Sequence, residues 1–354
     1  MKILNKTLKR IKPVDNKMRQ SVRKRLDSLA IPCRSLGRLE EFAEAIAGIK
    51  GVKNPTLKNK YIFTMAGDHG VAEEGVSAFP QEVTEQMVHN FIRGKASINV
   101  LARHVGAKVI VIDMGVKTDM RLGKGLVIKK VGYGTRNIAN GPAMDPDEAI
   151  KSLENGIEVL EEELKLHQID IAGAGDMGIA NTTPSSAIIA AITGEEVKKV
   201  TGRGTGINEA KLIHKIKVIE RALEVNSPDT EDPIDVLSKV GGYEIGGIAG
   251  LVLGCAANKI PVVIDGLISA AGALIAYELD NTVGDYLFAS HRSKEIGQKV
   301  ALDRMGLVPM LDLDMRLGEG TGAALAMDLL EASVKILNEV ASFDEANVTE
   351  GRVV

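Results

Sequence analysis

The stretch that decides the fold is IDIAGAGDMGIANTTPSSAIIAAITG, residues 169–194. A short apolar run ends in glycines and an acid, and a helical pattern follows almost at once. Thr183 suits the cap of that helix and Pro184 suits its first turn. Backbone N–H groups at such a start favour anions, and Asp176 can accept hydrogen bonds from sugar hydroxyls. A plain capped loop is the alternative for this stretch.

The same pattern recurs along the chain. Further apolar runs with glycine or an acid at one end are YIFTMAGDHG (61–70), KVIVIDMG (108–115), VVIDG (262–266) and DYLFASH (285–291). Helical patterns lie at residues 82–94, 184–194, 208–225 and 244–259. Strands that alternate with helices predict an α/β fold with a mostly parallel sheet flanked by helices. The functional site of such a sheet lies beyond the carboxyl ends of its strands.

Both ends of the chain are helical in pattern. DNKMRQSVRKRLDSLA (15–30) has an Asp cap and apolar residues at a helical period, and SLGRLEEFAEAIAGIKG (35–51) ends in glycine. The tail after Gly322 is again a long helical pattern. We therefore expect residues 1–58 plus 323–354 to form a small helical domain, and residues 59–322 to form the large α/β domain.

Composition excludes several classes of function. The 354 residues carry a net charge of −3 and no tryptophan, so nucleic acid is not the expected partner. Cys33 and Cys255 belong to no C-x-x-C pair, which argues against a disulfide framework and a structural zinc site. The basic N-terminus lacks the apolar core of a secretory signal, and no apolar run reaches about 18 residues. We expect a cytoplasmic protein without a membrane span.

Three loops offer weaker signals. TGRGTGI (201–207) has glycines at alternate positions with Arg203 and Lys215 nearby; it suits a phosphate site, but a flexible turn with solvated cations explains it equally well. His69 lies among acids in AGDHGVAEEG, although the spacing is not that of a metal site, and a loop that covers a ligand is the better interpretation. His291 could act as a general base, but a lone loop histidine is more often structural or solvated.

RLGEGTGAALA, residues 316–326, places a carboxylate between two glycines ahead of a helix. Glycines on both sides let the backbone approach a ligand closely. A partly desolvated carboxylate there can be a general base, and no Ser-His-Asp order or reactive cysteine competes with it. Glu319 is the strongest candidate for a catalytic residue.

Taken together, these segments closely resemble the nicotinate-nucleotide–dimethylbenzimidazole phosphoribosyltransferases, which assemble the lower ligand of cobalamin. The resemblance runs in order from about residue 35 to 343. It is carried by SLGRLE, AGDHGVAEEGVSAFPQEVT, VIDMGV, GTRNIANGPAM, GDMGIANTTPSSAI, TGRGTGI, GGYEIGGIAG, VVIDGLISAAGALIA, ASHRS and RLGEGTGAALA. It implies a Rossmann-like sheet, a small helical domain from both termini, and a homodimer.

The resemblance also implies a reaction without cofactor or metal. The 5-phosphoribosyl group of nicotinate mononucleotide would pass to 5,6-dimethylbenzimidazole, with inversion at C1′, giving α-ribazole 5′-phosphate and nicotinate. Carried over residue by residue, Glu319 would be the general base. The residues expected to bind the nucleotide and its phosphate are Asp176, Gly178, Arg203, Gly204, Lys215, Asp265 and Ser290.

Two features depart from the family pattern. Asp176 stands where glutamate is usual, so its contact with the ribose is open. Phe79 and Met87 occupy base-pocket positions where some members carry Ser and Gln, and Met177 and Leu317 would line the same pocket. Apolar residues here would hold a benzimidazole by packing and could change the accepted base. A nucleotide-binding relative that acts as a carrier or sensor, and an NAD-dependent dehydrogenase, are the alternatives; the second lacks a proper dinucleotide fingerprint.

Overall fold

The computed structural model describes residues 1–120 and 125–349. Its strands are β1 (Lys60–Gly67), β2 (Ala107–Gly115), β3 (Leu126–Ile128), β4 (Ile171–Met177), β5 (Val262–Ile264) and β6 (Leu287–Ala289). The helices of the N-terminal half are α1 (Lys2–Leu8), α2 (Asn16–Asp27), α3 (Arg38–Lys50), η1 (Gly70–Glu74), α4 (Val83–Ile92), α5 (Ser97–His104) and α6 (Pro146–Leu166). Those of the C-terminal half are α7 (Thr182–Thr193), α8 (Val197–Val200), α9 (Glu209–Asn226), α10 (Pro233–Val240), α11 (Tyr243–Ala257), α12 (Leu267–Leu279), η2 (Asn281–Tyr286), α13 (Gly297–Arg304), α14 (Thr321–Glu339) and α15 (Phe343–Ala346).

The strands form one parallel sheet in the order β3-β2-β1-β4-β5-β6. This is the order of a doubly wound Rossmann-like fold, and it confirms the predicted α/β class. The order reverses between β1 and β4, so the crevice of the fold opens at the carboxyl ends of those strands. The edge strand β3 was not predicted, because its apolar run, Leu126–Ile128, is only three residues long.

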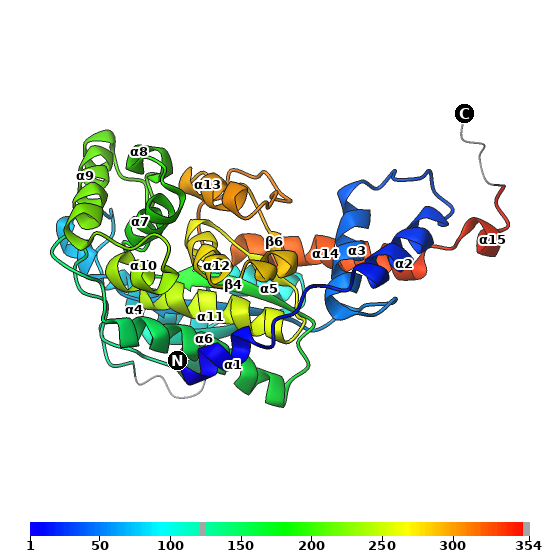
Figure 1. The fold of residues 1–354 in the computed structure, drawn as a ribbon, viewed down its shortest axis with the longest axis horizontal. Coiled ribbons are helices and arrows are strands. Elements are labelled where there is room, and N and C mark those ends of the chain that lie inside the picture. Colours follow the sequence, from blue (N-terminus) through cyan, green and yellow to red (C-terminus); the bar gives the residue numbers. More distant parts are fainter. Residues whose placement is uncertain (121–124, 350–354) are drawn as a thin grey trace.

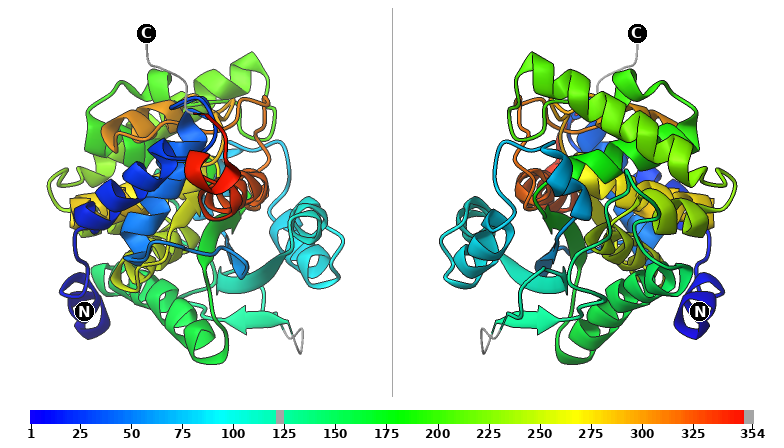
Figure 2. Two further views of the ribbon diagram at one scale, coloured as in Figure 1. Left: turned by 90° about the vertical axis from the view of Figure 1, so that its right-hand side faces the viewer. Right: turned by 90° about the vertical axis from the view of Figure 1, so that its left-hand side faces the viewer.

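Helices cover both faces of the sheet, which is why every residue of β1 is buried. Ile62 on one face lies against the start of α14, and the Thr64 hydroxyl donates to the backbone oxygen of Glu319 on that same side. Met65, one residue on, lies on the other face against Gly247 of α11. The period-two alternation of a strand therefore separates an α14 layer from an α11 layer. Figure 2 shows the sheet and the helices around it from two opposite sides of the molecule.

Glycines let α6 and α11 pack with their backbones in contact (Figure 1). A Cβ on Gly156 of α6 would lie 2.0 Å from the carbonyl oxygen of Gly247, and one on Gly250 would lie 2.0 Å from that of Leu153. No larger residue fits at these positions without separating the helices. The glycines of the GGYEIGGIAG segment therefore include a set that serves helix packing.

The terminal helices α2, α3 and the end of α14 share a second apolar cluster at one end of the molecule (Figure 1). Its buried members are Val22, Leu26, Leu29, Ala43, Ala47 and Leu337. Asp15 caps α2 as predicted, by accepting the Met18 N–H at 2.9 Å. Helix α1 lies elsewhere, on α6, where Glu154 accepts its Ile3 and Leu4 N–H groups. The division into two domains stays a prediction, and residues 350–354 lie outside the described part of the chain.

Two local predictions were wrong. Helix α7 begins at Thr182 with Asn181 as its cap residue, so Thr183 is a buried residue of the first turn and not the cap. In the segment DYLFASH (285–291), the strand ends before Ser290 as expected, but only Leu287–Ala289 pair with β5, so it begins later than the segment does. The reason is that Asp280 accepts the Thr282 N–H at 3.0 Å and starts the helical turn η2, which takes up Asp285 and Tyr286.

Candidate active site

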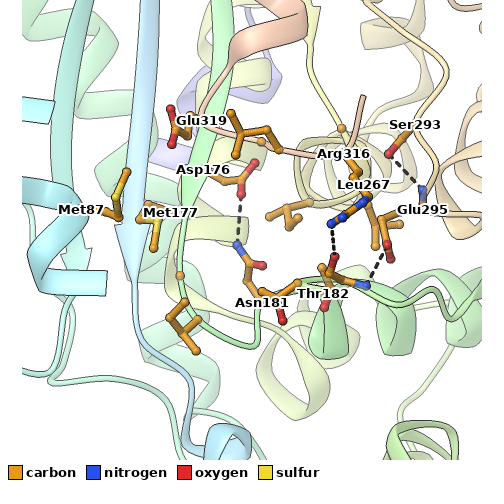
Figure 3. A pocket seen from close by; sticks show the side chains of 18 of the residues that line it. Met87, Asp176, Met177, Asn181, Thr182, Leu267, Ser293, Glu295, Arg316 and Glu319 are labelled. Carbon is orange, nitrogen blue, oxygen red and sulfur yellow. Dashed lines mark hydrogen bonds between the residues drawn. The ribbon is translucent and has the colours of Figure 1, made fainter. Parts of the chain in front are cut away.

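One cavity of about 370 Å³ opens at the carboxyl ends of β4, β5 and β6, within the size range of small-molecule sites. Its walls come from the loop that follows η1, the start of α4, the turns after β4 and β5, the glycine loop at 202–206, and the segments before α13 and α14. Figure 3 shows side chains from these segments converging on it. The crevice thus lies where the strand order predicts it.

The loop that carries Glu319 has an uncommon backbone. Gly318, Glu319 and Gly320 have φ values of 88°, 65° and 96°, all in the left-handed region that favours glycine. The loop also presses on β4, since a Cβ on Gly175 would lie 2.3 Å from the Glu319 carbonyl oxygen. A non-glycine residue held in this region is strained, and such strain is typical of functional positions.

The Glu319 carboxylate lines the cavity and is nearly buried. One of its oxygens accepts the Ile98 N–H of α5 at 3.1 Å. Burial raises the pKa of Glu319, and the Ile98 N–H partly opposes that rise. A carboxylate in this environment is a better proton acceptor than one in water, as general-base chemistry requires.

Asp265 anchors the loop that carries Glu319 by hydrogen bonds to its backbone. Its carboxylate accepts the N–H groups of Gly320 at 2.9 Å, Gly322 at 2.7 Å and Ala323 at 3.2 Å. Burial raises the pKa of Asp265 to about 7, against the three N–H groups that favour its charged form. The side chain therefore anchors the start of α14, and it does not line the cavity.

Ser290 and His291 support Asp265 in turn. The Ser290 hydroxyl donates to the backbone oxygen of Asp265 at 3.0 Å and lies 3.0 Å from His291 Nδ1. His291 is buried, not solvated, and burial lowers its pKa. Ser290 was expected to bind the nucleotide, but it too lies outside the cavity wall.

Asp176 is the last residue but one of β4 and lines the cavity (Figure 3). One carboxylate oxygen accepts the Asn181 side-chain amide at 3.1 Å, and the other has no partner among the described residues. Burial, joined by the charges of Asp265 and Glu244, raises the pKa of Asp176 well above its usual value. Gly178 follows in the same wall, where a Cβ would lie 2.3 Å from the Gly67 carbonyl oxygen. The second oxygen of Asp176 is available to a ligand hydroxyl.

Lys215 on α9 does not line the cavity but lies directly behind its wall, next to Gly204 and Thr182. Its Nζ is buried and donates to Thr182 Oγ1 at 2.6 Å. Burial lowers the pKa of Lys215 to about 8, although the charge of Glu295 raises it. Gly204, with φ at 52°, lies beside this ammonium and lines the cavity. Arg203 turns away from the cavity and pairs with Glu209 on the surface.

The rest of the wall is apolar. Phe79, Met87, Met177 and Leu317 line the cavity together, and their role as the pocket for the base stays a prediction. Phe79 and Leu317 are 53% and 57% exposed, so this side is open to solvent. Sequence reasoning did not assign Thr182, Leu267, Ser293, Glu295 and Arg316 to the site, although all five line the cavity. Four of these residues, all but Glu295, stand in motifs quoted above, and their place in those motifs was the signal available.

His69 does not belong to the cavity wall. Its Nε2 lies 2.7 Å from Glu244 in a fully buried pair. Burial acts against a charge on His69, but Glu244 raises its pKa overall. Across the residues that the structure describes, no three His, Cys, Asp or Glu side chains are grouped to hold a metal ion. Over the same residues, no helix is both long and apolar enough to cross a membrane.

Comparison with known proteins gives a consistent result. The family profile described as phosphoribosyltransferase matches residues 11–348. The nicotinate-nucleotide–dimethylbenzimidazole phosphoribosyltransferase of Geotalea uraniireducens is 60% identical, and that of Geobacter sulfurreducens is 58% identical. Each alignment spans 351 residues and covers 99% of both chains. The crystal structure of the enzyme of that name from Thermus thermophilus superposes with a TM-score of 0.90 at 43% identity, covering 95% of this chain and all of that one.

Proposed function

Because the chain belongs to the nicotinate-nucleotide–dimethylbenzimidazole phosphoribosyltransferase family, we propose that it transfers the 5-phosphoribosyl group from nicotinate mononucleotide to 5,6-dimethylbenzimidazole or a related base. The observation that carries the proposal is that one cavity joins a desolvated carboxylate and an apolar wall to a glycine loop beside a buried lysine. These are a proton acceptor, a surface for a flat ring and an anion site.

In the proposed reaction, the bond between C1′ and the nicotinate nitrogen breaks, and its electron pair returns to the ring. Nicotinate then leaves neutral at that nitrogen and needs no general acid. The unprotonated nitrogen of the benzimidazole forms the new bond to C1′, and its N–H proton passes to the Glu319 carboxylate. Attack from the face opposite nicotinate inverts C1′ and gives α-ribazole 5′-phosphate.

The roles of the other residues follow from their positions. Asp176 has an oxygen available for a ribose hydroxyl. The Gly204 loop and Arg316, which line the cavity, would hold the phosphate, with the Lys215 ammonium behind Gly204 adding positive charge. For Asp265 and Ser290 we propose a supporting role in place of direct nucleotide contact, since their polar atoms bond to protein groups. Arg203 reaches the phosphate only if its contacts with Ile207 and Glu209 break.

The direct test is the purified protein with nicotinate mononucleotide and dimethylbenzimidazole, followed by chromatography. Formation of α-ribazole 5′-phosphate in step with nicotinate supports the proposal. Binding of the nucleotide without turnover would instead favour a carrier or sensor. Family likeness also favours a homodimer, which sedimentation can check independently.

The pKa of Lys215 predicts a pH limit for nucleotide capture. Only the ammonium form attracts phosphate, and the lowered pKa means that this form is lost above about pH 8. We expect kcat/KM for nicotinate mononucleotide to fall about tenfold for each unit above pH 8, with a smaller change in kcat. Lys217→Gln, an exposed change on the same helix, should keep this profile. A flat kcat/KM from pH 7 to 10 would contradict the assignment.

Because Met87 belongs to the apolar wall, its replacement should weaken binding of the base and not of the nucleotide. Met87→Ala removes apolar contact from the base side, so KM for dimethylbenzimidazole should rise about tenfold. KM for the nucleotide should stay within about twofold, and it serves as the internal control. A panel of benzimidazoles and purines tests the packing argument further. Strict preference for one polar purine would show that hydrogen bonds, and not packing, select the base.

A further inference from the structure

A carboxylate lies inside the part of the cavity that is best suited to an anion (Figure 3). Glu295, just before α13, is 5% exposed and lines the cavity. Its Oε1 accepts the Gly204 N–H at 2.8 Å, while its Oε2 is buried without a hydrogen-bond partner in the described part of the chain. The carboxylate also covers Gly202, where a Cβ would lie 2.3 Å from Oε2. Glu295 thus sits on the glycine loop.

The groups around it are donors and cations. The Lys215 ammonium lies beside Gly204, since a Cβ built there would be 3.4 Å from Nζ. Within residues 1–120 and 125–349, Lys215 hydrogen-bonds to Thr182 and to the Gly202 carbonyl and forms no ion pair. Arg316 donates to the Gly204 carbonyl oxygen at 3.0 Å. The only anionic group in this set is the Glu295 carboxylate.

Such a placement works against a phosphate ligand. Backbone N–H groups of glycine loops are the donors that bind phosphate oxygens, and Glu295 already uses the one at Gly204. A carboxylate and a phosphate within a few ångströms of each other in a partly dry site repel strongly. Both cannot hold this N–H at once.

We propose that Glu295 is a built-in substitute for the substrate phosphate: its carboxylate occupies the anion subsite of the empty enzyme, and each phosphorylated ligand must displace it from Gly204. The inference rests on the proposed function for the location of the phosphate. It implies that Glu295 weakens binding of the nucleotide and of the phosphorylated product by one common factor. The uncharged base is not affected. Ser293, whose hydroxyl accepts the Glu295 N–H at 3.1 Å, lines the same cavity and remains there when the carboxylate leaves.

Glu295→Gln isolates the charge, because the glutamine oxygen can still accept the Gly204 N–H in the same volume. We expect Kd for inorganic phosphate, measured by calorimetry, to fall about tenfold. KM for nicotinate mononucleotide and the inhibition constant of α-ribazole 5′-phosphate should fall by the same factor, with KM for dimethylbenzimidazole unchanged. Glu196→Gln makes the same chemical change on the exposed surface and should leave all four constants unchanged. Unchanged or weaker phosphate binding in Glu295→Gln overturns the proposal.

A second variant guards against a folding artefact. Glu295→Ala removes the charge and the hydrogen bond together, and it should also tighten phosphate binding. The thermal unfolding midpoint shows whether the variant is folded. Weaker phosphate binding by a variant that keeps the wild-type midpoint would contradict the proposal that phosphate displaces the Glu295 carboxylate. The phosphate measurement does not depend on catalysis. If the wild-type enzyme makes no α-ribazole 5′-phosphate but Glu295→Gln still binds phosphate more tightly, the proposed function fails and the role of Glu295 stands.

Discussion

Replacing Glu319 by glutamine is expected to lower kcat about a thousandfold, with the affinity for nicotinate mononucleotide within about twofold of wild type. Glutamine keeps the size of the side chain and can still accept the Ile98 N–H that positions the carboxylate. It cannot take up the benzimidazole proton. The loss should therefore appear in the chemical step and not in binding.

Steady-state kinetics with product chromatography measure this effect, and the pH profile gives a second test. Because burial raises the pKa of Glu319, the wild-type kcat should decline on the acid side at a pH above the usual glutamate range, as the base becomes protonated. That acid limb should be absent from the residual activity of Glu319→Gln. Glu339→Gln, an exposed change at the far end of α14, is the matched control. Near-normal turnover in Glu319→Gln would remove the residue from the mechanism.

Asp265→Ala is expected to lower the free energy of unfolding by about 3 kcal/mol and kcat by at least about a hundredfold. The three N–H groups that Asp265 accepts are buried, and alanine leaves all of them without a partner. One belongs to Gly320, which directly follows Glu319, and the other two belong to the first turn of α14. A strained backbone conformation persists only where surrounding contacts fix it. Without the Asp265 hydrogen bonds, the loop should relax from its left-handed conformation and move Glu319 out of position.

Urea unfolding followed by circular dichroism measures the stability loss, and kinetics below the transition measure the catalytic one. Asp265→Asn keeps one acceptor oxygen and should lose less stability than Asp265→Ala. Asp303→Ala, the same change on exposed α13, should alter neither quantity. A variant that loses stability but keeps full kcat would show that Asp265 supports the fold without positioning Glu319.

Local patterns predicted much of the fold. Mainly apolar runs identified β1, β2, β4 and β5, because strands that are largely buried on both faces are rich in apolar side chains. They did not reveal β3, because a run of three apolar residues is too short to identify a strand. They also misplaced the start of β6, where an aspartate side chain diverted the backbone into a helical turn.

The sequence by itself therefore determined the α/β class, the parallel sheet and the position of Glu319 between two glycines. These follow from the spacing of apolar residues and from the backbone freedom of glycine, and both are local properties of the chain. Only the tertiary structure decided where the polar side chains point. Asp265 hydrogen-bonds to the loop that carries Glu319, and Arg203 points toward the surface and pairs with Glu209. Glu295 accepts a hydrogen bond from Gly204, although the two residues lie about 90 positions apart in the sequence. The physical reason is that side-chain direction depends on the donors, charges and packed neighbours that distant segments supply, and no local pattern encodes these.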